Sequence, residues 1–112
     1  MGVKKPLLKK DLEFIKNLEN LLYQRKVDMP QGSYTTTMYK KGLDKIAQKV
    51  GEEAVETVIA AKNKGRKETI EEAADLLFHL MLLLAEKDIP LKKVIKTLQK
   101  RHDKGNHKHI GE

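Results

Sequence analysis

The sequence of 112 residues lacks cysteine and tryptophan, and only 4% of its residues are aromatic. Without cysteine, it has neither a disulfide framework nor a thiolate metal site. The longest apolar run, from Leu80 to Ala85, is far too short to span a bilayer, and the first residues lack the apolar stretch of a secretion signal. We therefore expect a cytoplasmic protein in a reducing compartment that does not interact with membranes.

The length and composition predict a single domain. With 112 residues and 39% hydrophobic content, the chain can build a modest core, as one domain or one protomer of an oligomer, and has no room for a second catalytic domain. We place the domain at residues 1–102. The remaining segment, 103–112, has no periodic pattern and is expected to be a mobile tail.

Positive charge is in excess, with 23 lysines and arginines against 16 acids and a formal net charge of +7. This balance favours an anionic partner such as a nucleotide, a phosphorylated sugar or a nucleic acid. The few aromatic residues offer little stacking surface, which argues against binding of single-stranded nucleic acid. Any one lysine is more simply explained as solvated helix surface.

Apolar residues recur at three- and four-residue spacing, and no convincing alternating strand is found. The pattern predicts helices at about Leu8–Lys26, Met38–Lys62, Lys67–Lys87 and Leu91–His102, with a loop at 28–37 that contains Pro30 and Gly32. The sequence thus predicts an all-α bundle of about four helices. Because the third helix is apolar on nearly every side, we expect a homodimer that covers its exposed surface.

Four acids fall where the second and third helices would face each other: Glu53 and Glu56 on one, Glu72 and Asp75 on the other. The i, i+3 spacing sets each pair one helical turn apart, close enough to share an ion. Either pair alone could be an ordinary surface pair with the many lysines. Both pairs together, among alanines and leucines, favour a site that neutralises buried carboxylates with a cation.

Oxygen-only ligands indicate a hard ion, Mg²⁺ with Mn²⁺ as a possible substitute, which enzymes often share with substrate phosphates. Glu52 and Glu71 point away from the acidic strips by roughly 100° on a helical projection and are expected at the surface or behind the ligands. His79 follows Asp75 by four residues. It either orients Asp75, touches substrate or is a hydrogen-bonded core histidine.

Several segments in combination resemble the phosphoribosyl-ATP pyrophosphatase family: Gly32-Ser-Tyr-Thr35, Lys41-Gly-Leu-Asp-Lys-Ile46, Lys49-Val-Gly-Glu-Glu-Ala-Val-Glu56, Ala60-Ala-Lys-Asn63 and Glu71-Glu-Ala-Ala-Asp-Leu-Leu-Phe-His-Leu80. The resemblance covers about residues 8–102. It implies Mg²⁺-dependent hydrolysis of phosphoribosyl-ATP to phosphoribosyl-AMP and pyrophosphate, the second step of histidine biosynthesis. The Glu-x-x-Glu and Glu-x-x-Asp pairs alone mark the wider group of all-α, MazG-like nucleoside triphosphate pyrophosphohydrolases.

The resemblance assigns metal ligation to Glu53, Glu56, Glu72 and Asp75, the same acids that the helical projection selects. Hydrolysis also needs a group that accepts the proton of the attacking water, and we expect Glu56 or Glu53 in this role. The family's basic and hydroxyl positions, expected to bind substrate, fall on Ser33, Tyr34, Thr35, Lys41, Lys45, Lys49, Lys62 and Asn63.

Two other functions compete with this one. A house-cleaning pyrophosphohydrolase acting on dUTP or damaged nucleotides would share the fold and the ligands. A basic helical module that binds nucleic acid would need no metal and gives no reason for acids inside the bundle. We therefore expect a small-molecule nucleotide substrate and no nucleic-acid partner.

Overall fold

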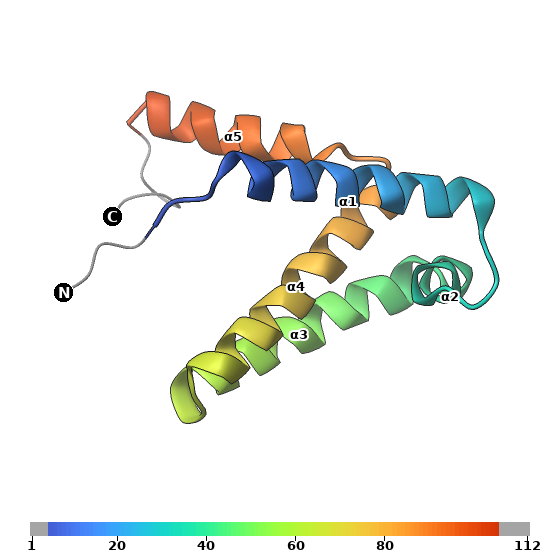
Figure 1. Cartoon of the computed structure of the whole chain (residues 1–112), viewed down its shortest axis with the longest axis horizontal. Helices are drawn as coiled ribbons and strands as arrows, with labels where there is room; N and C mark the ends of the chain where they lie inside the picture. Colours follow the sequence, from blue (N-terminus) through green and yellow to red (C-terminus); the bar gives the residue numbers. More distant parts are fainter. Residues whose placement is uncertain (1–4, 106–112) are drawn as a thin grey trace.

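The computed structural model describes residues 5–105, which form five helices and no strand (Figure 1). The helices are α1 (Lys9–Asp28), α2 (Tyr34–Lys41), α3 (Leu43–Asn63), α4 (Arg66–Glu86) and α5 (Leu91–Asp103). The two longest, α3 and α4, form an antiparallel hairpin, while α1 and α5 form a second arm at an angle to it. The predicted all-α class is confirmed. None of these helices is long and apolar enough to cross a membrane.

Helix α2 and its separation from α3 differ from the expected loop at 28–37 and the single long helix from Met38. The Ser33 hydroxyl caps α2 by accepting a hydrogen bond from the Thr36 amide at 3.2 Å. The helix ends at Gly42, whose φ of 93° suits glycine and starts α3 in a new direction. The chain therefore turns between the two helices, and α2 lies against both α1 and α3.

The core forms where α1, α2, α3 and α4 meet. Leu22, Ile46 and Leu82 are its largest fully buried side chains, and Met38, Tyr39, Met81 and Ala85 complete the cluster. The Tyr39 hydroxyl reaches across the core and donates a hydrogen bond to the Leu22 carbonyl oxygen at 2.9 Å. Burial of the short α2 in this cluster explains why it is helical despite its three threonines, which favour helix weakly.

Two polar contacts fix the end of α4 and the start of α5 on α1. The Lys26 ammonium group donates to the carbonyl oxygens of Ala85 and Glu86 and pairs with Asp88, all at 3.0–3.1 Å. Glu19 accepts a hydrogen bond from the Leu91 amide at 2.7 Å. Both side chains bond to main-chain groups at the ends of helices, where intrahelical partners run out.

Helix α5 is less buried than its pattern predicts. The spacing of Leu91, Val94, Ile95 and Leu98 predicts that all four face inward, but only Leu91 packs against the core and the other three are exposed. The expectation was wrong because periodicity shows only that one face of a helix is apolar. It does not show which element, if any, covers that face. The predicted tail begins at residue 103, where α5 ends, and residues 106–112 lie outside the described part of the chain.

Candidate active site

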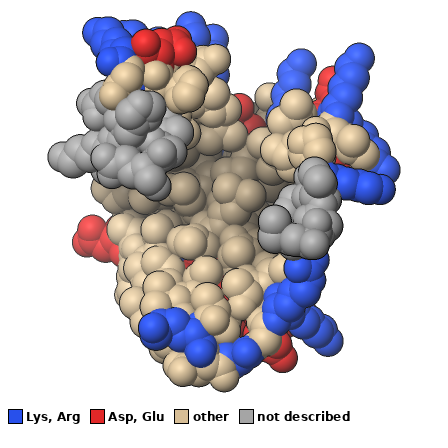
Figure 2. Space-filling model, turned by 90° about the vertical axis from the view of Figure 1, so that its left-hand side faces the viewer, with Lys and Arg blue, Asp and Glu red and all other residues tan. Residues whose placement is uncertain are grey.

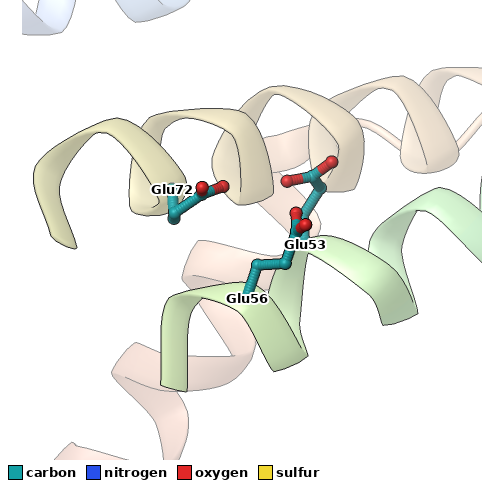
Figure 3. A group of neighbouring side chains, drawn as sticks. All are labelled: Glu53, Glu56 and Glu72. Carbon is teal, nitrogen blue, oxygen red and sulfur yellow. The ribbon is translucent and has the colours of Figure 1, made fainter. Parts of the chain in front are cut away.

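Three of the predicted metal ligands meet between α3 and α4. Glu53 and Glu56 on α3 and Glu72 on α4 each contribute a carboxylate oxygen, and these oxygens all lie within 4.8 Å of one another. Their carboxylates point toward one another across the space between the helices (Figure 3). The arrangement arises because the hairpin brings together two strips of acids that were each set by helical spacing.

Asp75, the fourth predicted ligand, is exposed and is not part of this group of three. It lies one turn beyond Glu72 on the same helix, and its negative charge contributes to raising the pKa of Glu72. Its role as a ligand therefore stays a prediction.

Glu53 is the buried member of the group, with only 5% of its surface exposed. Its Oε2 lies 3.2 Å from the Lys49 ammonium nitrogen, whereas its Oε1 is buried and has no hydrogen-bond partner. Burial alone would raise the pKa of Glu53, but the hydrogen bond and positive charge of Lys49, with contributions from Glu56 and His79, outweigh burial and lower the pKa. Glu53 is therefore held as a carboxylate with one unused acceptor.

The charge of Glu53 contributes to raising the pKa values of the other two acids. Hydrogen bonding with Glu53, followed by repulsion from its charge, raises the pKa of Glu56. Burial, followed by the charge of Glu53, raises the pKa of Glu72. The Lys49 ammonium group is the cation paired with Glu53, and it also contacts Glu52 at 3.4 Å. The cluster thus carries excess negative charge, and its oxygen donors suit a hard divalent cation.

His79 is a buried, hydrogen-bonded histidine next to the acids. Its Nδ1 lies 2.7 Å from the main-chain oxygen of Asp75, and its Nε2 lies 2.8 Å from the hydroxyl of Tyr34. Of the roles that the sequence left open, the hydrogen-bonded core histidine is the one that the structure supports. Burial raises the pKa of Tyr34, the charge of Lys49 opposes this rise, and the charge of Glu53 adds to it.

The remaining predicted substrate-binding residues lie on or near α2 and along α3. Ser33 caps α2 and Thr35 is buried in its first turn. Lys41 ends α2, Lys45 lies in the first turn of α3, and Lys62 and Asn63 end α3. Among these, Lys49 is the residue with a direct contact to the acid group. Substrate binding by the whole set stays a prediction.

One polar residue near this set was not singled out from the sequence. The Arg25 guanidinium, on α1, donates a hydrogen bond from Nη1 to the Ser33 hydroxyl at 2.9 Å. Arg25 precedes Ser33 by eight residues, across the turn between α1 and α2. No helical spacing links the two positions, so this pair could not be predicted from periodicity.

An open pocket of about 430 Å³ adjoins the acid group. Among residues 5–105, its lining includes Gly51, Glu52, Val55 and Glu56 of α3. This volume lies within the range of small-molecule sites in proteins. Glu56 belongs both to the acid group and to this pocket, so a ligand in the pocket would contact its carboxylate and that of Glu52.

Within residues 5–105 the fold is all-α, and three carboxylates meet between two antiparallel helices. Comparison with known proteins identifies the family. Residues 15–102 match the family of phosphoribosyl-ATP pyrophosphohydrolases. The chain belongs to this family of hydrolases, which confirms the resemblance seen in the sequence.

Individual relatives agree with this assignment. The chain is 50% identical over 91 residues to a phosphoribosyl-ATP pyrophosphatase of Leptospira biflexa, covering 81% of this chain and 99% of the relative. It is 51% identical over 83 residues to the phosphoribosyl-ATP pyrophosphatase of Methanocella arvoryzae, covering 72% and 87%. A histidine biosynthesis bifunctional protein of Bacillus subtilis is 52% identical over 85 residues, which are 76% of this chain and 41% of that protein. The chain therefore spans less than half of this bifunctional relative.

Proposed function

We propose that this protein hydrolyses phosphoribosyl-ATP to phosphoribosyl-AMP and pyrophosphate in histidine biosynthesis, and that the reaction depends on Mg²⁺. The substrate and pathway follow from its family and from the printed names of its relatives. The observation that carries the proposal is the group formed by Glu53, Glu56 and Glu72 between α3 and α4. A pyrophosphohydrolase needs such a group, because a triphosphate is held and activated through divalent cations.

The acid group fits a divalent cation because of the orphaned oxygen of Glu53. A buried carboxylate oxygen without a hydrogen-bond partner is costly, and a bound cation would remove that cost. We assign Glu53, Glu56 and Glu72 as the ligands, with Asp75 next to them on α4 as a fourth. When bound, Mg²⁺ would neutralise phosphate oxygens and lower the pKa of a bound water.

The protein's own side chains then supply positive charge, proton acceptance and substrate binding. Lys49 holds the Glu53 carboxylate ionised and adds positive charge beside the phosphates. Glu56 is exposed and lines the pocket, so it is the carboxylate open to an attacking water. We assign proton acceptance to Glu56, with Glu53 as the buried ligand that stays ionised. Lys41, Lys45, Lys62 and Asn63, together with Ser33, Tyr34 and Thr35, are the proposed substrate-binding residues.

The function is tested by comparing turnover of phosphoribosyl-ATP with that of dUTP and the common nucleoside triphosphates. All are supplied at equal concentration with Mg²⁺, and pyrophosphate release is measured. We expect phosphoribosyl-ATP to be preferred by at least tenfold in kcat/KM, about 1.4 kcal/mol of discrimination. Preference for dUTP or another triphosphate would reassign the protein as a house-cleaning pyrophosphohydrolase. Turnover in ¹⁸O-labelled water assigns the attacked phosphorus: label in phosphoribosyl-AMP indicates α, and label only in pyrophosphate indicates β.

We further propose that the protein is a cytoplasmic homodimer that uses no nucleic-acid or membrane partner. Val55, Val58 and Ile59 on α3 and Ile70, Leu77 and Leu80 on α4 are exposed, although large apolar side chains normally become buried. Figure 2 shows a hollowed face whose centre is neither acidic nor basic, with lysines and arginines toward its edges. Light scattering at micromolar concentration should give twice the chain mass of 12.8 kDa. A monomeric mass would contradict the dimer.

A further inference from the structure

The hydrogen bonds of His79 fix which of its ring nitrogens carries the proton. His79 is only 6% exposed, and its Nδ1 lies 2.7 Å from the main-chain oxygen of Asp75. A carbonyl oxygen can only accept, so Nδ1 donates, and Nε2 of the neutral ring is then an acceptor. The Tyr34 hydroxyl, 2.8 Å from Nε2, must therefore donate to it. His79 thus holds the Tyr34 phenol in one orientation.

The Tyr34 ring is partly packed and partly open. Its edge contact with His79 has a centroid distance of 5.7 Å and an interplanar angle of 87°, and Phe78 lies 6.3 Å away on a tilted plane. Even so, 48% of the residue is exposed. Since the phenol is tied to His79 and the ring rests against Phe78 and His79, the exposed part of the ring is presented in a fixed position.

Tyr34 is the aromatic side chain best placed for a ligand of the acid group. The chain has three tyrosines and two phenylalanines, and all five fall within residues 5–105. Tyr39 is buried, Tyr23 and Phe78 are half-buried, and Phe14 is exposed on α1. Tyr34 alone combines an exposed ring with a direct hydrogen bond to His79, the histidine whose Nδ1 bonds to the main-chain oxygen of Asp75.

We propose that the Tyr34 ring stacks on the purine of the substrate and that His79 is the positioning residue that holds this ring beside the carboxylates. The inference rests on the proposed function, because in that function the substrate carries a purine and its triphosphate binds at the acid group. Stacking on an aromatic ring suits a purine, which offers a flat face and needs no particular hydrogen-bond pattern. A ring held by a buried histidine loses little freedom on binding.

Binding of ATP and of inorganic tripolyphosphate separates stacking from phosphate recognition. Isothermal titration calorimetry in Mg²⁺ buffer would compare wild-type protein with Tyr34→Ala and with Phe14→Leu, a matched loss of the exposed ring on α1. We expect Tyr34→Ala to weaken ATP binding about tenfold and to leave tripolyphosphate binding within twofold. Phe14→Leu should change neither. Equal weakening of both ligands by Tyr34→Ala, or of neither, would overturn the stacking role.

A double-mutant cycle tests whether His79 acts through Tyr34. Tyr34→Phe and His79→Leu each remove the same hydrogen bond, and each should weaken ATP binding about threefold. The double variant should be no weaker than either single variant, because the shared bond can be lost only once. Additive losses would overturn the positioning role. If His79→Leu fails to fold, Tyr34→Phe still removes the hydrogen bond, from the exposed side chain. Unchanged ATP binding by Tyr34→Phe would then overturn the positioning role of His79.

These measurements remain informative if the proposed substrate is wrong. Failure of the proposed function appears as absent phosphoribosyl-ATP turnover by the wild-type protein. Failure of the present inference appears as a ratio of ATP to tripolyphosphate affinity that Tyr34→Ala does not change. The two results are independent, since the second uses only binding and no hydrolysis.

Discussion

Lys49 and Glu53 lie one helical turn apart on α3 and form an ion pair of 3.2 Å in which the Glu53 side chain is almost fully buried. A buried carboxylate held ionised by a single lysine, with its second oxygen unpartnered, is a poor way to stabilise a fold. It is a suitable way to keep a ligand ready for a cation.

Removal of charge from the acid group should abolish turnover and leave the fold intact. Glu53→Gln and Asp75→Asn should each lower kcat for phosphoribosyl-ATP by about 100-fold or more, because each removes a proposed ligand. Glu71→Gln, on an exposed position of α4, is the matched control and should keep near wild-type activity. Helical circular dichroism should be unchanged in all three. Retained activity in Glu53→Gln or Asp75→Asn would remove that residue from the metal site.

Repulsion within the acid group should make the metal-free protein less stable than a neutral variant. The pKa of Glu72 is raised in the folded protein, by burial and then by the charge of Glu53. A group whose pKa is higher in the folded than in the unfolded state contributes stability at pH values below its unfolded-state pKa. That contribution is lost as the pH rises through the folded-state pKa. At pH 7, Glu72→Gln should therefore raise the melting temperature in chelator, measured by circular dichroism.

The same variant separates metal binding from general stabilisation. Saturating Mg²⁺ should raise the melting temperature of the wild-type protein by several degrees, since a ligand that binds only the folded state stabilises it. Glu72→Gln should show little of this increase. An equal Mg²⁺ effect on the wild type and the variant would place the cation elsewhere.

The contact of Lys26 with the end of α4 should contribute to stability and not to catalysis. Its ammonium group bonds two carbonyl oxygens and Asp88 at a helix C-terminus, where a cation is favourable. Lys26→Met should lower the free energy of unfolding by about 1–2 kcal/mol in urea titrations. Lys96→Met, at an exposed position of α5, should change it by less than about 0.5 kcal/mol. Equal effects of the two variants would show that the Lys26 contacts contribute nothing specific.

Burial of Tyr39 should make the protein sensitive to alkaline pH. Desolvation, followed by the charge of Glu86, raises the pKa of Tyr39 to about 12 from an ordinary value of 10.0. The resulting stability is complete below pH 10 and is lost as pH rises toward 12, because the folded state resists losing the proton. Urea titrations at pH 8 and pH 11 should therefore show a smaller alkaline loss in Tyr39→Phe than in the wild type. Identical losses would contradict this origin.

Much of the acid group could be predicted from the sequence, because helical spacing alone sets Glu53 beside Glu56 and places Glu72 on the facing strip. What spacing could not decide is how α3 and α4 rotate against each other. That rotation buries Glu53, leaves Glu56 exposed and keeps Asp75 outside the group of three. Membership of a helical strip therefore predicts proximity and not burial.

The fold was less predictable where tertiary contacts decide the structure. Threonine favours helix weakly, so the burial of Thr35 and Thr36 in α2, which packs against α1 and α3, could not be read from local pattern. The link from Tyr34 to His79 joins residues 45 positions apart and has no periodic signal. The apolar faces of Val94 and Leu98 were evident, but their exposure depends on what packs beside α5.

The most direct test of the account is the position of a bound divalent ion. Crystals of the protein grown with Mn²⁺, measured at the manganese absorption edge, would locate the ion by its anomalous scattering. We predict a peak between α3 and α4, within about 2.5 Å of carboxylate oxygens from Glu53, Glu56 and Glu72. A map with no peak at these carboxylates, from a preparation whose turnover requires Mn²⁺, would contradict it.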